Sequence, residues 1–260
     1  DGNVEAFSYT QVRVIEAWIG LLATNLPPAF GLHQLLQELR RALSARLRAA
    51  QTAQGSRLCA VDWHSLAAPV LQEIAQVGQR DFTVPSACAS ETCRLWSLLH
   101  VLTAEGFRRQ PETTTALDGE PLAARPAELL TSIRDFLEEY FKCLYCRRHF
   151  LEQFDRGSYG LHSARRDAGE AVLYFWRLHN AVSVRIAAEH SCDEVDRRWP
   201  PLSVCAKCWD IESPHDWEVL SETLAMQEGG RGGPRAADAV RALRSRASPQ
   251  EPEVLRFLLA

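Results

Sequence analysis

The sequence predicts an all-α protein, and three observations support this fold class. Apolar residues recur every three or four positions in successive stretches, Pro and Gly clusters separate these stretches, and no stretch sustains the alternation that marks a half-buried strand. The chain has 260 residues, of which 46% are hydrophobic, which is enough for one large core or two modest ones. We therefore expect a bundle of helices around a shared core.

The first part of the chain contains three predicted helices. Residues 9–24 carry apolar side chains near a 3.6-residue period and stop just before Pro27. Residues 32–50 place leucines on one stripe, with arginines largely on the other faces. Residues 62–78 are a third candidate, and residues 79–88 are expected to be a connector.

Further helices are predicted in the rest of the chain. They cover residues 93–105, 127–141, 170–189 and a stretch near 215–226, and we expect loops at 110–126 and 156–167. Residues 229–233 are a glycine-rich break, because Gly adds conformational freedom and packs nothing. Residues 235–247 can form a helix, but the whole of 227–260 is expected to be a flexible or weakly packed tail.

Composition and charge argue against two classes of partner. The formal net charge is −4 and the sequence pI is about 6.1, so no broad positive field would hold a nucleic-acid backbone, and we expect no nucleic-acid partner. The apolar stretches fall far short of the roughly 20 residues that a bilayer-spanning helix needs, so we expect no membrane span. The chain begins with Asp1 rather than Met, which suggests a mature or excised piece of a longer protein.

Cysteine spacing gives the most specific signal in the sequence. Four of the eight cysteines form two CxxC pairs, Cys143 with Cys146 and Cys205 with Cys208. A chain of this length needs no disulfide to hold a core, so close pairs favour redox chemistry, metal binding or export. The four sulfurs could bind zinc in a zinc-stabilised helical interaction module, although the gap between the pairs exceeds that of a common zinc ribbon. For the second pair we favour a disulfide that clasps the last helix or relays electrons.

The first CxxC pair is the candidate redox site. A disulfide that closes so short a loop is easily reduced. Basic residues at Lys142, Arg147 and Arg148 flank the pair, and both positive charge and a helix N-terminus favour the reactive thiolate. The alternative is an inert pair or a short structural disulfide.

Tryptophan and histidine side chains accompany this pair in the predicted bundle. Each alone is more often a core residue than a ligand contact. Together they offer ring faces for stacking and donors for a flat aromatic cofactor with a polar tail. The residues concerned are Trp96, His100, His149, Trp176, His179, Asn180, Ser183 and Trp199.

Four motifs carry a resemblance to a known family. They are Cys93-Arg-Leu-Trp96-xxx-His100, Phe141-Lys-Cys143-xx-Cys146-Arg-Arg-His149, Trp176-xx-His179-Asn180 and Trp199-Pro-Pro201-xxx-Cys205-xx-Cys208. In order, spacing and identity they resemble the flavin-binding Erv-type module. The Trp-Pro-Pro ending further resembles the C-terminal half of the quiescin sulfhydryl oxidase family. The resemblance covers roughly residues 88–226.

This resemblance implies an FAD-dependent sulfhydryl (thiol) oxidase that forms disulfides in protein or small dithiol substrates. Electrons would pass from the catalytic pair, Cys143 and Cys146, to FAD and then to molecular oxygen, which gives hydrogen peroxide. A substrate thiolate would attack Cys143, and Cys146 would face the flavin. The implied FAD contacts are Trp96, His100, His149, Trp176, His179, Asn180, Ser183 and Trp199. The implied further disulfides are Cys88–Cys93, as a structural bridge, and the distal pair Cys205–Cys208.

The resemblance also implies a domain order and partners. Residues 1–80 would be a degenerate helical domain without flavin, residues 81–226 the Erv-type FAD-binding domain, and residues 227–260 the tail. Whole enzymes of the family carry an upstream thioredoxin-like domain, and nothing in this sequence resembles one. The implied setting is an oxidising compartment of the secretory pathway, with thiol-containing proteins as substrates.

A few positions depart from the family pattern. Ala89 and Asp196 stand where the family has basic residues near FAD, and Tyr145 replaces an acidic residue before the second active cysteine. Cys59 and Cys192 have no family counterpart, and they either pair with each other or stay free. The candidates to replace the missing basic contacts are Arg94, Arg197 and Arg198.

Overall fold

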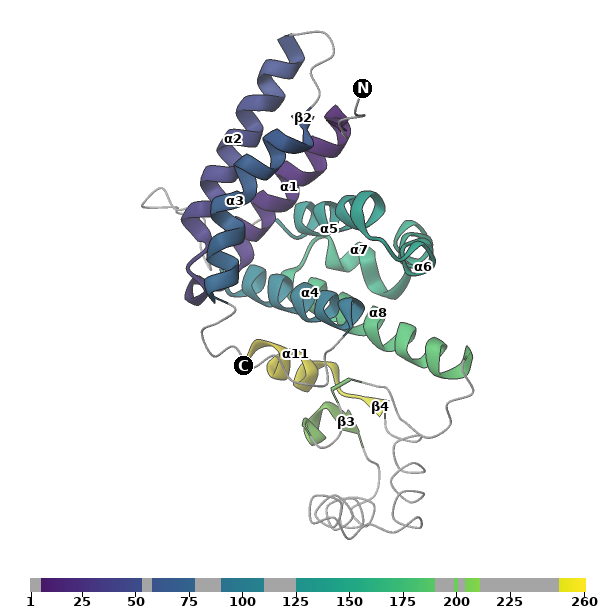
Figure 1. Ribbon diagram of the computed structural model, residues 1–260. Helices are drawn as coiled ribbons and strands as arrows, with labels where there is room; N and C mark the ends of the chain where they lie inside the picture. The colour runs from purple at the N-terminus through teal and green to yellow at the C-terminus, as the bar shows by residue number, and fades with distance from the viewer. Residues whose placement is uncertain are drawn as a thin grey trace. The chain divides into compact units, whose positions relative to one another are not determined.

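The protein is mostly helical, as the sequence predicts (Figure 1). The computed structural model describes residues 6–52, 58–77, 90–109, 125–189, 199–200, 204–210 and 248–260. The chain divides into two compact units, Asp1–Ala171 and Val172–Ala260, and the division falls inside helix α8. The predicted domain boundary at residue 80 stays a prediction, and helices from both sides of it share the first unit.

The first unit is built mainly from helices. Its elements are β1 (Ala6–Phe7), α1 (Tyr9–Asn25), η1 (Pro28–Phe30), α2 (His33–Thr52), β2 (Leu58–Cys59), α3 (Ala60–Val77), α4 (Glu91–Arg108), α5 (Pro126–Tyr140), α6 (Leu144–Asp155), η2 (Ser158–Gly160), α7 (Leu161–Ala164) and the start of α8 (Ala168–Glu189). The two short strands pair antiparallel, with Ala6 opposite Cys59. The prediction of a loop at 156–167 is wrong, because this stretch contains η2 and α7.

Helix α1 begins and ends where local chemistry directs it. Ser8 is the N-cap: its Oγ accepts from the Gln11 backbone N–H at 3.2 Å, and Gln11 Oε1 accepts from the Ser8 N–H at 2.8 Å. This reciprocal pair satisfies two amide groups that the helix leaves unbonded. The helix ends before the prolines at 27 and 28, since Pro has no N–H to continue it.

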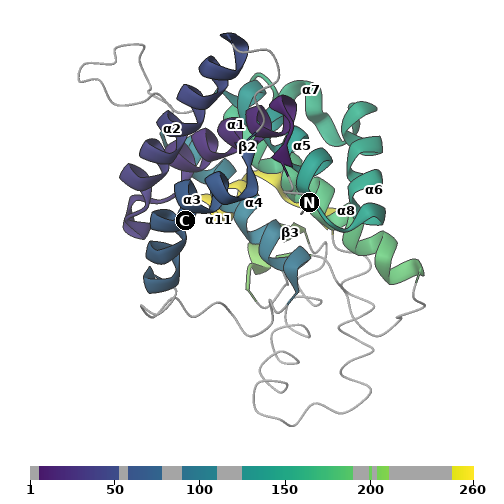
Figure 2. The same ribbon diagram turned by 45° about the horizontal axis from the view of Figure 1, so that its top comes forward.

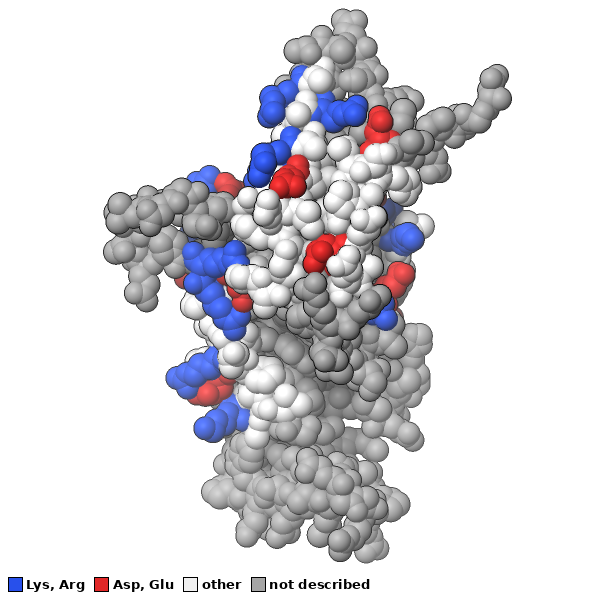
Figure 3. Space-filling view, turned by 60° about the vertical axis from the view of Figure 1, so that its left-hand side comes forward, with Lys and Arg blue, Asp and Glu red and all other residues white. Residues whose placement is uncertain are grey.

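Helices α1, α2 and α3 share one core and lie side by side in both ribbon views (Figures 1 and 2). Their buried side chains are Val12, Ile15, Ile19, Ala23, Leu32, Leu36, Leu39, Leu43, Leu47 and Val70. The opposite face of α2 carries exposed Arg40, Arg41, Arg46 and Arg48. Figure 3 shows basic side chains gathered over this helix. The predicted leucine stripe with arginines on the other faces is thereby confirmed.

Helix α1 also packs against α4 and α5. The rings of Trp18 and Phe136 stack with centroids 4.0 Å apart and an interplanar angle of 9°. Asn25 is fully buried and donates from Nδ2 to the Leu102 carbonyl at 3.1 Å. A Cβ at Gly106 would lie 2.6 Å from Asn25 Nδ2, so glycine lets the two helices approach at this point. These contacts hold α4 and α5 against α1.

The second unit has a small core of its own. Besides most of α8 it contains η3 (Ala206–Cys208), β3 (Trp209–Asp210), β4 (Ser248–Pro249) and α11 (Glu251–Leu259). Strands β3 and β4 pair antiparallel, with Trp209 opposite Pro249. The core combines Leu173, Trp176, Cys208, Trp209 and Val254.

Helix α11 corrects the prediction that residues 227–260 form a weakly packed tail. Val254 is fully buried, and Phe257 packs against the same core. Arg177 of α8 donates from Nε and Nη2 to the Glu251 carboxylate at 2.6 and 2.8 Å, and this lowers the pKa of Glu251. Apolar burial and a two-point ion pair therefore hold residues 248–260. The helices predicted at 215–226 and 235–247 lie outside the described residues.

Candidate active site

The first CxxC pair forms a disulfide at the N-terminus of α6. Cys143 is the N-cap residue, and its Sγ accepts from the Cys146 backbone N–H at 3.3 Å. The Cα atoms of the two cysteines are 5.3 Å apart. The partial positive charge of a helix N-terminus stabilises negative charge on sulfur, so this position favours a thiolate once the bond is reduced.

The disulfide is open to a partner molecule. Both cysteines are half-buried, while the two residues between them, Leu144 and Tyr145, are 65% and 52% exposed. Exposed apolar side chains of this size beside a reactive bond are typical of contact surfaces. The arrangement lets a substrate sulfur approach the bond.

Arginine side chains fix α6 against α5 at both ends. Arg147 donates from Nη1 to the Glu138 carbonyl at 2.9 Å, near the disulfide. Arg134 donates from Nε to Asp155 Oδ1 at 3.0 Å and from Nη1 to Glu138 Oε2 at 2.6 Å. The hydrogen bond to Asp155, more than any other interaction, raises the pKa of Arg134 above its ordinary value. Charge-assisted bonds therefore hold α6 against α5.

The predicted flavin contacts of the first unit lie on α4 and α6. Trp96 and His100 are one turn apart on α4, with ring centroids 6.4 Å apart and an interplanar angle of 30°. His149 follows Cys146 by one turn. The rings of His149 and Tyr145 are T-shaped, with centroids 4.3 Å apart. His149 Nδ1 is 4.0 Å from Glu152 Oε2.

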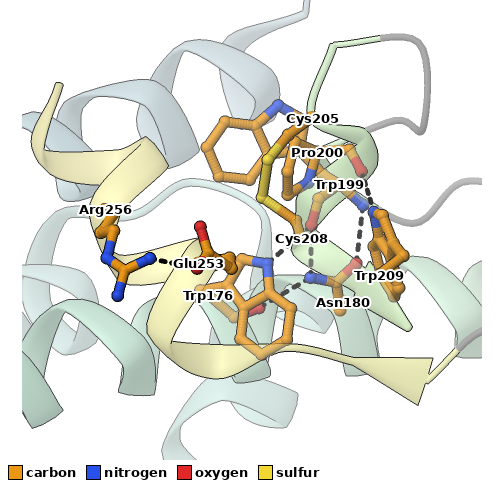
Figure 4. The surroundings of a disulfide bond; sticks show 9 residues. All are labelled: Trp176, Asn180, Trp199, Pro200, Cys205, Cys208, Trp209, Glu253 and Arg256. Atoms are coloured by element: carbon orange, nitrogen blue, oxygen red, sulfur yellow. Dashed lines mark hydrogen bonds and ion pairs between the residues drawn. A yellow bond between two sulfur atoms is a disulfide. The ribbon is translucent and has the colours of Figure 1, made fainter.

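The predicted contacts of the second unit form a hydrogen-bonded cluster around Trp199 (Figure 4). Trp176 Nε1 donates to the Trp199 carbonyl at 2.7 Å, and Asn180 Nδ2 donates to the same oxygen at 2.8 Å. The Trp199 N–H donates back to Asn180 Oδ1 at 2.7 Å. The structure thus brings Trp176, Asn180 and Trp199 together, and it shows that Asn180 and Trp176 direct their polar atoms at the Trp199 backbone.

Two other predicted contacts, His179 and Ser183, lie on the same helix. The His179 ring stacks on Trp199 with centroids 5.9 Å apart and an interplanar angle of 29°. Burial lowers the pKa of His179 to about 4, so its imidazole is neutral at neutral pH. Ser183 follows one turn later and is half-buried.

The second CxxC pair, Cys205 and Cys208, is also a disulfide, with Cα atoms 5.4 Å apart. Cys208 is fully buried and packs with Trp209 and Val254, and Trp209 Nε1 donates to the Pro200 carbonyl at 2.9 Å (Figure 4). Cys205 is half-buried, as Cys143 and Cys146 are, so the choice between a clasp and an electron relay for this pair stays a prediction. Helix α11 packs against this pair, whereas the last helix that the sequence predicts, near 215–226, lies outside the described residues.

The zinc alternative is not supported. Each CxxC pair closes on itself as a disulfide, which leaves no thiolate for a tetrahedral zinc site. Within the described ranges, no group of three or more His, Cys, Asp or Glu could hold a metal ion. In the same ranges, no helix combines the length and the apolar character needed to cross a bilayer.

Several other predicted residues lie beyond the described part of the chain. Cys93 is disulfide-bonded, and its predicted partner Cys88 is outside the described residues. The side chains of Cys59 and Cys192 are also outside them, so the pairing of these two cysteines stays open. The remaining positions are Ala89, Asp196, Arg197 and Arg198.

The donor set fits a flat aromatic cofactor such as FAD. In the first unit the rings of Trp96 and His100 offer stacking faces, and in the second unit those of His179, which is neutral, and Trp199 do so. Arg94 directly follows Cys93 in α4 and is exposed. Its side chain makes no hydrogen bond or ion pair among the described residues. It is therefore free to meet a phosphate.

Part of the chain is similar to a known protein family. The Erv1 / Alr family model matches residues 93–200. The chain is 33% identical over 132 residues to Sulfhydryl oxidase 1 of Pongo abelii, which covers 46% of this chain and 16% of that protein. It is 32% identical over 134 residues to Sulfhydryl oxidase 2 of Mus musculus, which covers 49% of this chain and 18% of that protein. The matched part thus spans less than a fifth of either relative.

A solved structure shares the fold over almost the whole chain. It is described as "Sulfhydryl Oxidase Fragment of Human QSOX1", and it superposes with a TM-score of 0.62, covering 98% of this chain and 84% of that chain. At 18% sequence identity this likeness concerns the fold alone.

Proposed function

We propose that this chain, whose residues 93–200 match the Erv1 / Alr family model, is an FAD-dependent thiol oxidase that forms disulfides in thiol-containing substrates. One observation carries the proposal. An accessible disulfide, Cys143–Cys146, is held at the N-terminus of a helix inside the matched region, with two exposed residues between its cysteines and basic side chains beside it. Sulfhydryl oxidases that match this region support the same activity.

The proposed reaction begins at Cys143. A substrate thiolate attacks Cys143 Sγ, the bond to Cys146 breaks, and Cys146 leaves as a thiolate. A second substrate thiolate then attacks the substrate sulfur of the mixed disulfide, which forms the product disulfide and releases Cys143. The pair has gained two electrons, and the substrate has lost two electrons and two protons. FAD, when bound, supplies the acceptor for these electrons and the site where oxygen becomes hydrogen peroxide.

The protein's own contribution is to prepare the sulfur atoms. The N–H of Cys146 points at Cys143 Sγ, and the α6 N-terminus lies beneath both cysteines. Both features lower the free energy of a thiolate relative to a thiol. Arg147, anchored on the Glu138 carbonyl, keeps this end of α6 and its positive charge in place.

We further propose which residues hold FAD. Ring contacts come from Trp96, His100 and His149 in the first unit, and from the α8 segment Trp176 to Ser183 together with Trp199 in the second. The hydrogen bonds of Asn180 and Trp176 to the Trp199 backbone support a division of labour, in which these two side chains set the position of the Trp199 ring. Arg94 is the described candidate for a phosphate contact.

The setting and partners are part of the proposal. An oxidising compartment of the secretory pathway suits a protein with at least two closed disulfides. The substrates are thiol-containing proteins or small dithiols, and the final electron acceptor is molecular oxygen. In a longer protein, an upstream thioredoxin-like domain would deliver substrate electrons to Cys143.

Oxygen consumption with dithiothreitol tests the proposal. The flavin-loaded chain is expected to consume oxygen and produce hydrogen peroxide, and Cys143→Ser and Cys146→Ser are each expected to reduce turnover to background while keeping the fold and the flavin. Normal turnover in either variant would overturn the assignment of the pair. A purified chain that binds no flavin and consumes no oxygen would overturn the oxidase itself.

A further inference from the structure

A surface hollow of about 600 Å³ runs along α6 and begins at Leu144, which lies between the two cysteines of the proposed redox disulfide. Its lining residues recur at helical spacing from Leu144 through Leu151 to Arg156, so they form one stripe of the helix. We call this stripe the α6 groove. Helix α6 lies beside α5 in the first unit (Figure 2), and Cys143 of the disulfide is its N-cap residue.

The groove has an apolar start and uncommitted positive charge. Leu144 is 65% exposed. Leu151, about two turns further along α6, is half-buried. Arg148 and Arg156 are exposed, and neither guanidinium group enters a hydrogen bond or ion pair within the described ranges. Among the described residues, the positive charges of Arg148 and Arg156 are therefore not used in holding the fold together.

The acidic members of the stripe do not cancel this charge. Asp155 is bound by Arg134 at 3.0 Å, and Glu152 is the single remaining carboxylate between the two arginines. Glu152 itself lies 4.0 Å from His149 Nδ1. Two free cations therefore face one carboxylate along the groove, which favours an anionic partner.

The dimensions of the groove fit a short stretch of polypeptide. From Leu144 to Arg156 the helix rises about 18 Å, a length that about five or six residues span in extended form. A small dithiol that reacts at Cys143 does not reach this far. A peptide that presents its cysteine to Cys143 must pass its flanking residues over the exposed side chain of Leu144.

We propose that the α6 groove binds the polypeptide segment that flanks the substrate cysteines, and that it selects segments with acidic side chains. The inference rests on the proposed function, since it names the substrate class of the same disulfide. Leu144 receives an apolar side chain next to the substrate cysteine, and Arg148 and Arg156 pair with carboxylates further along. The oxidase is therefore a catalyst for acidic protein dithiols, and small dithiols bypass its selectivity.

Two synthetic peptides test this proposal. Each contains one Cys-x-x-Cys pair followed by six residues, with either two Glu or two Lys at matched positions. With the flavin-loaded chain at low salt, kcat/KM measured by oxygen uptake is expected to be about fivefold higher for the Glu peptide, and the difference should shrink in high salt. Equal kcat/KM for the two peptides would overturn the groove.

Matched charge reversals locate the effect. Arg156→Glu lies three turns from the disulfide and is expected to remove or reverse the preference, while dithiothreitol oxidation stays unchanged. Arg41→Glu makes the same change of charge on the exposed face of α2 and should keep the preference. Equal shifts in both variants would mean that net charge, rather than the groove, sets the preference, which would contradict the proposal.

A binding measurement separates this proposal from the oxidase activity. The same peptides with Ser in place of Cys can be labelled and followed by fluorescence anisotropy, which needs no turnover. The Glu peptide is expected to bind more tightly than the Lys peptide, and Arg156→Glu should abolish the difference. Absence of any difference would overturn the groove even where dithiothreitol is oxidised, whereas loss of dithiothreitol oxidation alone would count against the proposed function.

Discussion

The side-chain amide of Asn180 is hydrogen-bonded to both polar atoms of the Trp199 backbone. Asn180 Nδ2 donates to the Trp199 carbonyl at 2.8 Å, and the Trp199 N–H donates to Asn180 Oδ1 at 2.7 Å. The amide therefore acts as a local substitute for a strand partner and fixes a residue that no helix or sheet holds. Because His179 stacks on the Trp199 ring, the same bond pair also sets the surroundings of that histidine.

Replacing Asn180 is expected to release Trp199. Asn180→Ala removes both bonds. The Trp199 N–H loses its partner, while the Trp199 carbonyl keeps the hydrogen bond from Trp176 Nε1, so the free energy of unfolding should fall by about 1–3 kcal/mol. Flavin retention during gel filtration should fall in parallel. Val184→Ala is the matched control on the same helix, because Val184 is 54% exposed. Unchanged stability and flavin content in Asn180→Ala would contradict the positioning role.

The second disulfide is expected to matter for stability more than for turnover. Cys205→Ala with Cys208→Ala removes a bridge whose Cys208 is fully buried beside Trp209 and Val254. Loss of a bridge with so short a loop should lower the free energy of unfolding by about 2 kcal/mol. Oxidation of dithiothreitol by the flavin-loaded variant should stay near the native rate.

The contrasting pair of substitutions serves as the control. Cys143→Ala with Cys146→Ala should abolish dithiothreitol oxidation, with a loss of stability similar to that of the other double variant, because both bridges close equally short loops. Equal loss of turnover in both double variants, with flavin and melting temperature preserved, would mean that Cys205 and Cys208 belong to the obligatory electron path.

The low pKa of His179 predicts a pH-dependent loss of stability. Burial lowers this pKa to about 4 in the folded chain, below the ordinary value of 6.5. Above pH 6.5 both states are neutral and the histidine contributes no pH dependence. As the pH falls from 6.5 towards 4, the unfolded chain binds a proton that the folded chain does not, so the free energy of unfolding decreases.

Comparison with a variant isolates this contribution, since carboxylates such as Glu251 titrate in the same range. Between pH 7 and pH 4.5, urea unfolding of the flavin-free chain should lose about 2 kcal/mol more stability than that of His179→Gln. Parallel curves for the two proteins would show that His179 is not held neutral by burial.

The two redox cysteines are expected to differ in their relation to the flavin. Cys146 leads along α6 to His149, one turn away, which we propose as a flavin contact. In Cys143→Ser the remaining Cys146 thiolate should lie near the ring and give a broad long-wavelength absorption band, which fades as acid protonates the sulfur. Cys146→Ser should lack the band. A band in Cys146→Ser alone would mean that the roles of the two cysteines are reversed.

Local pattern explains how much of this fold was predictable. The stripe from Leu32 to Leu47 and the capping pair Ser8 and Gln11 act within a helix turn or two, so α1 and α2 follow from the sequence to within a few residues. The same holds for the CxxC spacing, which places Cys143 and Cys146 within bonding distance.

Long-range pairings were not predictable in the same way. The bonds from Asn25 to Leu102 and from Arg177 to Glu251 each join residues more than 70 positions apart, and helical periodicity does not specify such partners. Helix α11 was missed because the glycine-rich break suggested a loose tail. The apolar spacing of Val254, Phe257 and Leu258 was the signal that could have identified it.

Anaerobic reduction of the flavin by a dithiol tests the central claim most directly. The flavin-loaded chain is mixed with dithiothreitol in the absence of oxygen, and the visible absorption of the flavin is followed. The account predicts rapid bleaching that reverses when oxygen is admitted, and no rapid bleaching in Cys143→Ser or Cys146→Ser. A flavin that stays oxidised in the native chain, or bleaches equally fast in both variants, would contradict electron transfer through the Cys143–Cys146 disulfide.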